Sequence, residues 1–95
     1  MRDAVALDPE RARAQLFLGT LLHVQGRDRE ARPFVEKAVV LDPADAPSRL
    51  ALGLVLDACG ERAGAIAALR EAARLDPGST RARAELERLT AEGRR

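Results

Sequence analysis

The tripeptide Leu-Asp-Pro occurs three times in this chain at a constant interval, and this repeat constrains the fold more than any other feature. Its prolines are Pro9, Pro43 and Pro77, so successive copies lie 34 residues apart. Residues 12–45 align with residues 46–79 without a gap, and eleven aligned positions are identical. These positions are Ala12/Ala46, Leu16/Leu50, Leu18/Leu52, Gly19/Gly53, Leu22/Leu56, Gly26/Gly60, Ala31/Ala65, Ala38/Ala72, Leu41/Leu75, Asp42/Asp76 and Pro43/Pro77. Such a period indicates an array in which each repeat is one supersecondary unit.

Each unit is predicted to be a pair of helices. The chain is rich in Ala and Leu, which favour helices, and holds two Phe but no Tyr or Trp. In the first unit, apolar positions one turn apart predict a helix over 11–25 that stops at Gly26, then one over 29–41 with Asp28 as N-cap. The second unit predicts helices over 46–58, capped by Asp45, and over 62–75. The fold class is therefore all-α.

Two features of these helices have structural consequences. Gly19 and Gly53 have no side chain, so we expect a neighbouring helix to approach closely at each position. Pro33 falls inside the second helix of the first unit, where the second unit has Ala67. A proline in a helix interior removes one backbone hydrogen bond. The sequence therefore predicts that this helix starts late or kinks before Pro33.

The pattern resembles the tetratricopeptide repeat family, whose repeat runs W-x₂-L-G-x₂-Y, then A-x₃-F, then P. The matching positions are Gln15, Leu18, Gly19, Leu22, Ala31, Val35 and Pro43 in the first unit, and Arg49, Leu52, Gly53, Leu56, Ala65, Leu69 and Pro77 in the second. The Leu-Gly pair, the alanine and the proline are present, while the aromatic positions hold other residues. The resemblance implies a right-handed superhelical solenoid of antiparallel hairpins, in which stacked neighbours cover each other's apolar faces.

On this interpretation the whole chain, 1–95, is a single domain with two full repeats, 12–45 and 46–79. Residues 80–95 keep one apolar stripe among charged residues, which is typical of a terminal capping helix, with Ser79 as its N-cap. Residues 1–9 match only the tail of a preceding repeat. The chain is then either a fragment of a longer array or an array that begins with half a helix. The open N-terminal end predicts homo-oligomers, with Met1, Val5 and Leu7 poorly covered.

Charge and composition favour some partners over others. Sixteen basic and fifteen acidic residues are mixed along the chain, without the basic surplus expected of nucleic-acid binding. No apolar run approaches the ~20 residues of a membrane span, and no signal peptide is recognisable at the N-terminus. We therefore expect no nucleic-acid or membrane partner, and a cytoplasmic location if residue 1 is the native start. The excess of Arg over Lys is typical of a GC-rich bacterial genome.

Catalytic and cofactor motifs are missing from the sequence. It contains no phosphate-binding loop, dinucleotide fingerprint, HExxH or CxxC pattern. His23 and Cys59 are the single histidine and the single cysteine, and they lie in different repeats. We therefore predict no catalytic residues, no metal site, no cofactor and no internal disulfide.

In the tetratricopeptide family, the first helix of each repeat lines a concave groove that holds peptides. The resemblance maps this groove onto Arg13, Leu16, Phe17, Thr20 and His23, then Leu50, Ala51, Leu54 and Asp57, then Arg81, Ala84, Glu85 and Arg88. The carboxylate clamp of the chaperone-binding subgroup would fall on Leu16, Thr20, Ala51, Arg81 and Glu85, and four of these five do not fit it. One alternative is that the groove leucines only pack between helices, and another is that Arg81 and Arg88 line an anion site.

The sequence thus predicts a scaffold that binds a protein or peptide of unknown identity in the groove, without catalysis. The alternative is an accessory segment of a longer enzyme, for example a transferase, that positions its protein substrate. We predict Leu16 and Leu50 as the apolar anchors, because they recur at the repeat period. On this view both lie outside the hairpin core.

Overall fold

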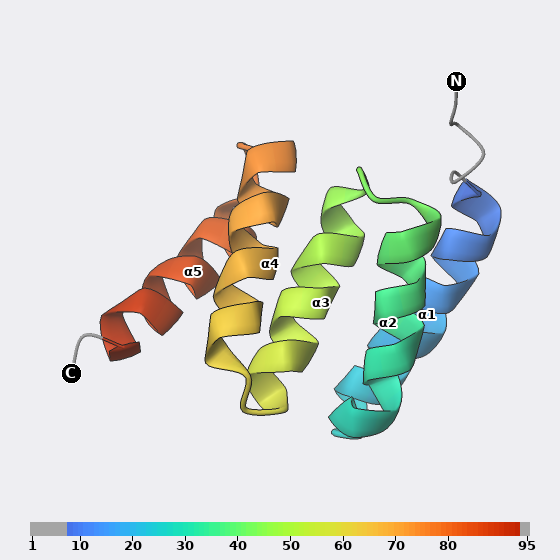
Figure 1. Ribbon diagram of the computed structural model, residues 1–95, viewed down its shortest axis with the longest axis horizontal. Coiled ribbons are helices and arrows are strands. Elements are labelled where there is room, and N and C mark those ends of the chain that lie inside the picture. Colours follow the sequence, from blue (N-terminus) through green and yellow to red (C-terminus); the bar gives the residue numbers. More distant parts are fainter. Residues whose placement is uncertain (1–7, 94–95) are drawn as a thin grey trace.

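The computed structural model describes residues 8–93, which form five helices stacked in sequence order (Figure 1). These are α1 (Pro9–Val24), α2 (Asp28–Leu41), α3 (Ala46–Ala58), α4 (Arg62–Leu75) and α5 (Thr80–Gly93). In the view of Figure 1, α1 lies behind α2. Helices adjacent in sequence pack against each other, so α1 and α5 form the two ends of the stack. The described residues contain no strand, which confirms the all-α prediction. Residues 1–7 and 94–95, with the predictions made for them, lie outside the described part.

The helices begin and end for reasons that are visible in the sequence. Asp45 and Ser79 cap α3 and α5 as predicted. Their side-chain oxygens accept hydrogen bonds from the backbone N–H groups of Ser48 and Ala82. Gly26 and Gly60 end the first helix of each repeat with φ values of +79° and +85°. This left-handed conformation is available to glycine at no steric cost.

Two predictions about helix starts, and one alternative of a third, were wrong. Helix α1 begins at Pro9 rather than at residue 11, because Asp8 caps it and a proline at the first position loses no helical hydrogen bond. Asp28 is the first residue of α2 and not its cap, and its carboxylate is instead paired with His23. Helix α2 also does not start late, since it runs from Asp28 through Pro33.

The position of Pro33 explains why the helix tolerates it. The first backbone hydrogen bond of α2 runs from Ala31 N–H to the carbonyl of Arg27. Pro33 therefore removes only the bond that would reach the Arg29 carbonyl. Arg29 and Pro33 are both exposed, so water can satisfy that carbonyl. Whether α2 bends at this point stays a prediction.

Glycine allows the two helices of each hairpin to lie close together. A Cβ atom added at Gly19 would lie 2.6 Å from Val35 Cγ1, and one added at Gly53 would lie 2.6 Å from Leu69 Cγ. Val35 and Leu69 are completely buried. The prediction of a close helix approach at both glycines is confirmed.

The hydrophobic core consists of two clusters that follow each other along the helical stack. One contains Val35 and Val55 between α2 and α3, and the other contains Leu69 and Leu89 between α4 and α5. Leu52 packs against both clusters, so the core continues from one repeat into the next. Each hairpin thus obtains cover for its apolar face from its neighbour, as in other helical arrays.

Candidate functional site

The first helix of each repeat and the capping helix share one groove-lining surface. A cavity of about 220 Å³ lies where α1, α3 and α5 come together. Its walls are mostly apolar, with polar groups from two side chains. The lining residues are Leu16, Thr20, Pro47, Leu50, Ala51, Leu54 and Arg81. Small apolar recesses with a few polar groups are typical binding sites.

Two further cavities continue this surface towards the loops between the repeats. One, of about 290 Å³, shares Leu16 and Pro47 with the cavity above and includes Arg13 and Asp42. The other, of about 90 Å³, shares Pro47 and Leu50. Most residues of these two cavities are related by the 34-residue repeat: Ala12/Ala46, Arg13/Pro47, Leu16/Leu50, Asp42/Asp76 and Asp45/Ser79. The groove therefore presents the same recess twice, one repeat apart.

The structure brings together six of the residues predicted for the groove: Leu16, Thr20, Leu50, Ala51, Leu54 and Arg81. Arg13 lines the adjoining cavity. Phe17 lines none of these recesses, and its side chain is 67 % exposed. His23, Asp57 and Arg88 lie outside the cavities and form ion pairs. Sequence reasoning left out Pro47, which the alignment with Arg13 could have identified.

Leu16 and Leu50 have two roles. Leu16 packs against the cluster of Val35 and Val55, and Leu50 against the cluster of Leu69. The prediction that both lie outside the core is therefore wrong. Each is half-buried, with one side in the core and the other in the groove. A substitution at either position disturbs packing as well as the groove surface.

Leu54 is different, because it lines the groove and belongs to neither core cluster. At the same repeat position α1 has Thr20 and α5 has Arg88. The fold therefore accepts a polar or charged side chain there. Leu54 is the apolar groove residue whose loss would disturb the core least.

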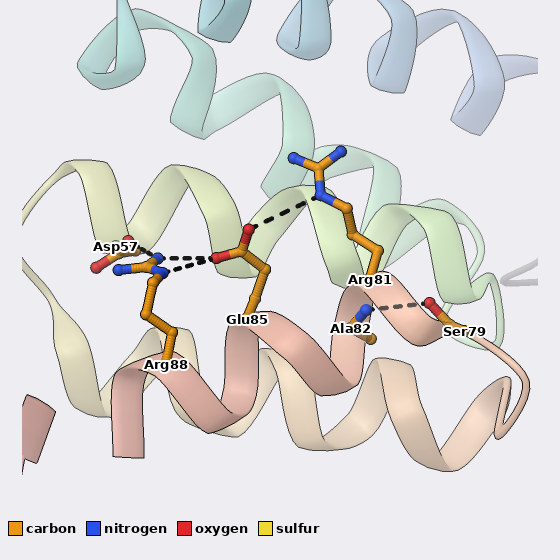
Figure 2. A network of polar contacts seen from close by, with 6 residues as sticks. All are labelled: Asp57, Ser79, Arg81, Ala82, Glu85 and Arg88. Atoms are coloured by element: carbon orange, nitrogen blue, oxygen red, sulfur yellow. Dashed lines mark hydrogen bonds and ion pairs between the residues drawn. The ribbon is translucent and has the colours of Figure 1, made fainter. Parts of the chain in front are cut away.

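Acidic residues surround the two predicted groove arginines of α5 (Figure 2). Arg88 Nη2 lies 2.8 Å from Asp57 Oδ2 on α3 and 2.8 Å from Glu85 Oε1 on its own helix. Glu85 also lies 3.8 Å from Arg81. The hydrogen bonds that Arg88 donates to Asp57 and Glu85 raise the pKa of Arg88 above its usual value. Two carboxylates thus offset two guanidinium groups, which argues against an anion site at Arg81 and Arg88.

A fourth cavity, of about 440 Å³, lies between the turn after α1 and the end of α3. Its walls are Gly26, Arg27, Asp28, Arg29, Glu30, Ala58 and Cys59. Two of its charged groups pair with each other: Arg27 Nε lies 2.7 Å from Glu30 Oε1, which lowers the pKa of Glu30. Across residues 8–93, no three His, Cys, Asp or Glu side chains lie close enough to hold a metal ion. No helix of that segment is long and apolar enough to cross a bilayer.

Residues 46–79, the second of the two units, match the family model described as tetratricopeptide repeat. The chain carries a tetratricopeptide repeat. The matched residues are α3, α4 and the turn that follows, and α1 and α2 form a second hairpin of the same design. Tetratricopeptide repeats are protein–protein interaction modules, and the family is typically non-catalytic. A comparison with curated proteins found no match.

Proposed function

We propose that this chain is a protein-interaction module that holds an extended or helical peptide in the groove formed by α1, α3 and α5. The observation that carries the proposal is the cavity between these helices, with Leu54, Leu50 and Leu16 on its walls. Peptide grooves bind apolar side chains as anchors and use polar groups at the edge for orientation. The module has no catalytic role of its own.

The chemistry of the walls indicates the kind of peptide. Leucine and proline side chains favour an aliphatic or aromatic anchor, since burying apolar surface is the main source of affinity. Arg81 at one end and Arg13 beside Asp42 at the other supply charges of both signs. A peptide with one or two apolar residues flanked by charges fits this surface better than a uniformly acidic or basic one.

The experiment uses a random twelve-residue peptide library selected against the 95-residue chain, with binding of the enriched peptide measured by fluorescence anisotropy. Leu54→Arg copies the residue that α5 has at this position, so it should remain folded while closing the groove. We expect it to weaken peptide binding at least roughly tenfold, which is the usual effect of losing a central anchor.

Two controls make the result specific. Val40→Arg places the same charge on α2, at a position 65 % exposed and outside the groove, and should leave binding unchanged. Leu50→Asp should lower the melting temperature as well as the affinity, because Leu50 packs against the core. A folded Leu54→Arg variant that binds the peptide as tightly as the unchanged chain would place the recognition surface elsewhere.

A further inference from the structure

The outer face of α1 carries large apolar side chains that are exposed to solvent. Phe17, Leu21 and Val24 are spaced four and three residues apart, so they form one stripe along the helix. Their exposed fractions are 67 %, 44 % and 76 %. Leu18, beside this stripe, is 41 % exposed. Contiguous exposed apolar residues of this kind mark an interaction surface.

The repeat shows which surface of α3 and α5 corresponds to the outer face of α1. Leu21 has the same repeat position as Val55 in α3 and Leu89 in α5. Val55 and Leu89 are 1 % and 0 % exposed, because each is packed against the second helix of the preceding hairpin. Leu18 corresponds to Leu52 and Leu86, which also pack against core clusters. The outer face of α1 is therefore the stacking face of a repeat, without a neighbour among the described residues.

We propose that two copies of this chain associate through this face, with α1 of one copy packed antiparallel against α1 of the other. We call the surface formed by Phe17, Leu18, Leu21 and Val24 the α1 stripe. A two-fold arrangement buries both stripes at once, because the Phe17 end of each helix faces the Val24 end of its copy.

The opposite end of the stack does not suit this surface. The exposed positions of α5 include Arg83 and Glu87, so a head-to-tail contact would bury charges against the α1 stripe, and burying unpaired charges is costly. The two-fold pairing avoids this cost. A two-fold interface is also closed, whereas head-to-tail contacts grow into longer assemblies. The expected product is a dimer and nothing larger.

Sedimentation equilibrium of the 95-residue chain between about 10 µM and 1 mM tests the proposal. We expect a reversible monomer–dimer equilibrium with a dissociation constant of roughly 0.1–1 mM, since one helix face is smaller than a standard stable interface. Leu21→Glu should weaken the dimer at least tenfold. Val24→Glu is a second variant in case the first unfolds, because Val24 is the most exposed residue of the stripe.

The control is Val40→Glu, which places the same charge on α2. Val35 lies on the side of α2 that contacts Gly19 of α1. Val40 comes five residues later, so its side chain points away from that side. This variant should form dimers like the unchanged chain. The proposal is overturned by a monomer at 1 mM, by a mass that rises beyond twice the monomer, or by folded stripe variants that still dimerise normally.

Discussion

Gly53→Ala tests whether glycine sets the spacing of the hairpin. The added Cβ would lie 2.6 Å from Leu69 Cγ, 2.8 Å from Leu69 Cδ2 and 3.3 Å from the Ala65 carbonyl oxygen. Leu69 is completely buried at the centre of its cluster, and Ala65 is buried beside it. Neither neighbour can move without displacing others, so α3 and α4 must separate.

The magnitude follows from two opposing effects. Alanine is favoured over glycine in a helix interior by about 1 kcal/mol. Overpacking a filled core costs about 1–3 kcal/mol, and the two contacts below 3 Å place this site near the upper end. We expect a net loss of about 2 kcal/mol in the free energy of unfolding. For a domain of this size that lowers the melting temperature by roughly 10 °C, measured by urea and thermal unfolding with circular dichroism.

Gly64→Ala is the matched control on α4. There the added Cβ would meet only Leu56 Cδ1, at 3.3 Å, which is the end of a flexible side chain. The free energy of unfolding should stay the same or rise by up to about 1 kcal/mol. If Gly53→Ala is as stable as Gly64→Ala, glycine does not set the helix spacing and the argument fails.

Three further predictions concern the ends of the helices. Asp45→Ala should cost about 1 kcal/mol of unfolding free energy, because it removes the cap of α3, whereas Asp45→Asn should largely preserve it. Gly60→Ala should cost about 1 kcal/mol, because the residue sits at φ +85° with open space around it; an unchanged urea midpoint would contradict this. Arg27 lowers the pKa of Glu30 below 4.5, so their pairing stabilises the fold above that pH and is lost as the pH falls through the lowered pKa. Arg27→Gln should therefore flatten the dependence of the melting temperature on pH between about 5 and 2, and a slope equal to that of the unchanged chain would argue against the pairing.

Much of the fold could be predicted because its signals are local and occur twice. Gly26 and Gly60 end helices by backbone conformation alone, and Asp45 caps a helix by contacts three residues away. The 34-residue period fixes which helices are equivalent, so the hairpin design follows without knowledge of side-chain contacts. The close helix approach at Gly19 could be predicted in the same way, because a glycine at a repeated helical position leaves room for a neighbouring helix.

Contacts between distant residues could not be predicted from such signals. Arg32 pairs with Glu61 across 29 residues, and Arg88 pairs with Asp57 across 31. These pairs depend on how far each hairpin rotates relative to the next, which no local pattern records. The error on Leu16 has the same origin: periodicity places it on the groove side of α1, but the contact with the neighbouring cluster arises from stacking.

Two adjacent positions of the repeat differ in how freely their residues vary. One position carries Thr20, Leu54 and Arg88, a sequence of side chains that changes from polar to apolar to charged. The next carries Leu21, Val55 and Leu89, which are all branched aliphatic. The first position can vary because its residues belong to neither core cluster, whereas the second must fill the space between hairpins. The exposure of Leu21 alone in its set therefore reflects the absence of a neighbouring hairpin among residues 8–93 and not a relaxed requirement. The proposed groove binding and the proposed self-association use different faces of α1, so Leu54→Arg should leave dimer formation intact and Leu21→Glu should leave peptide binding intact.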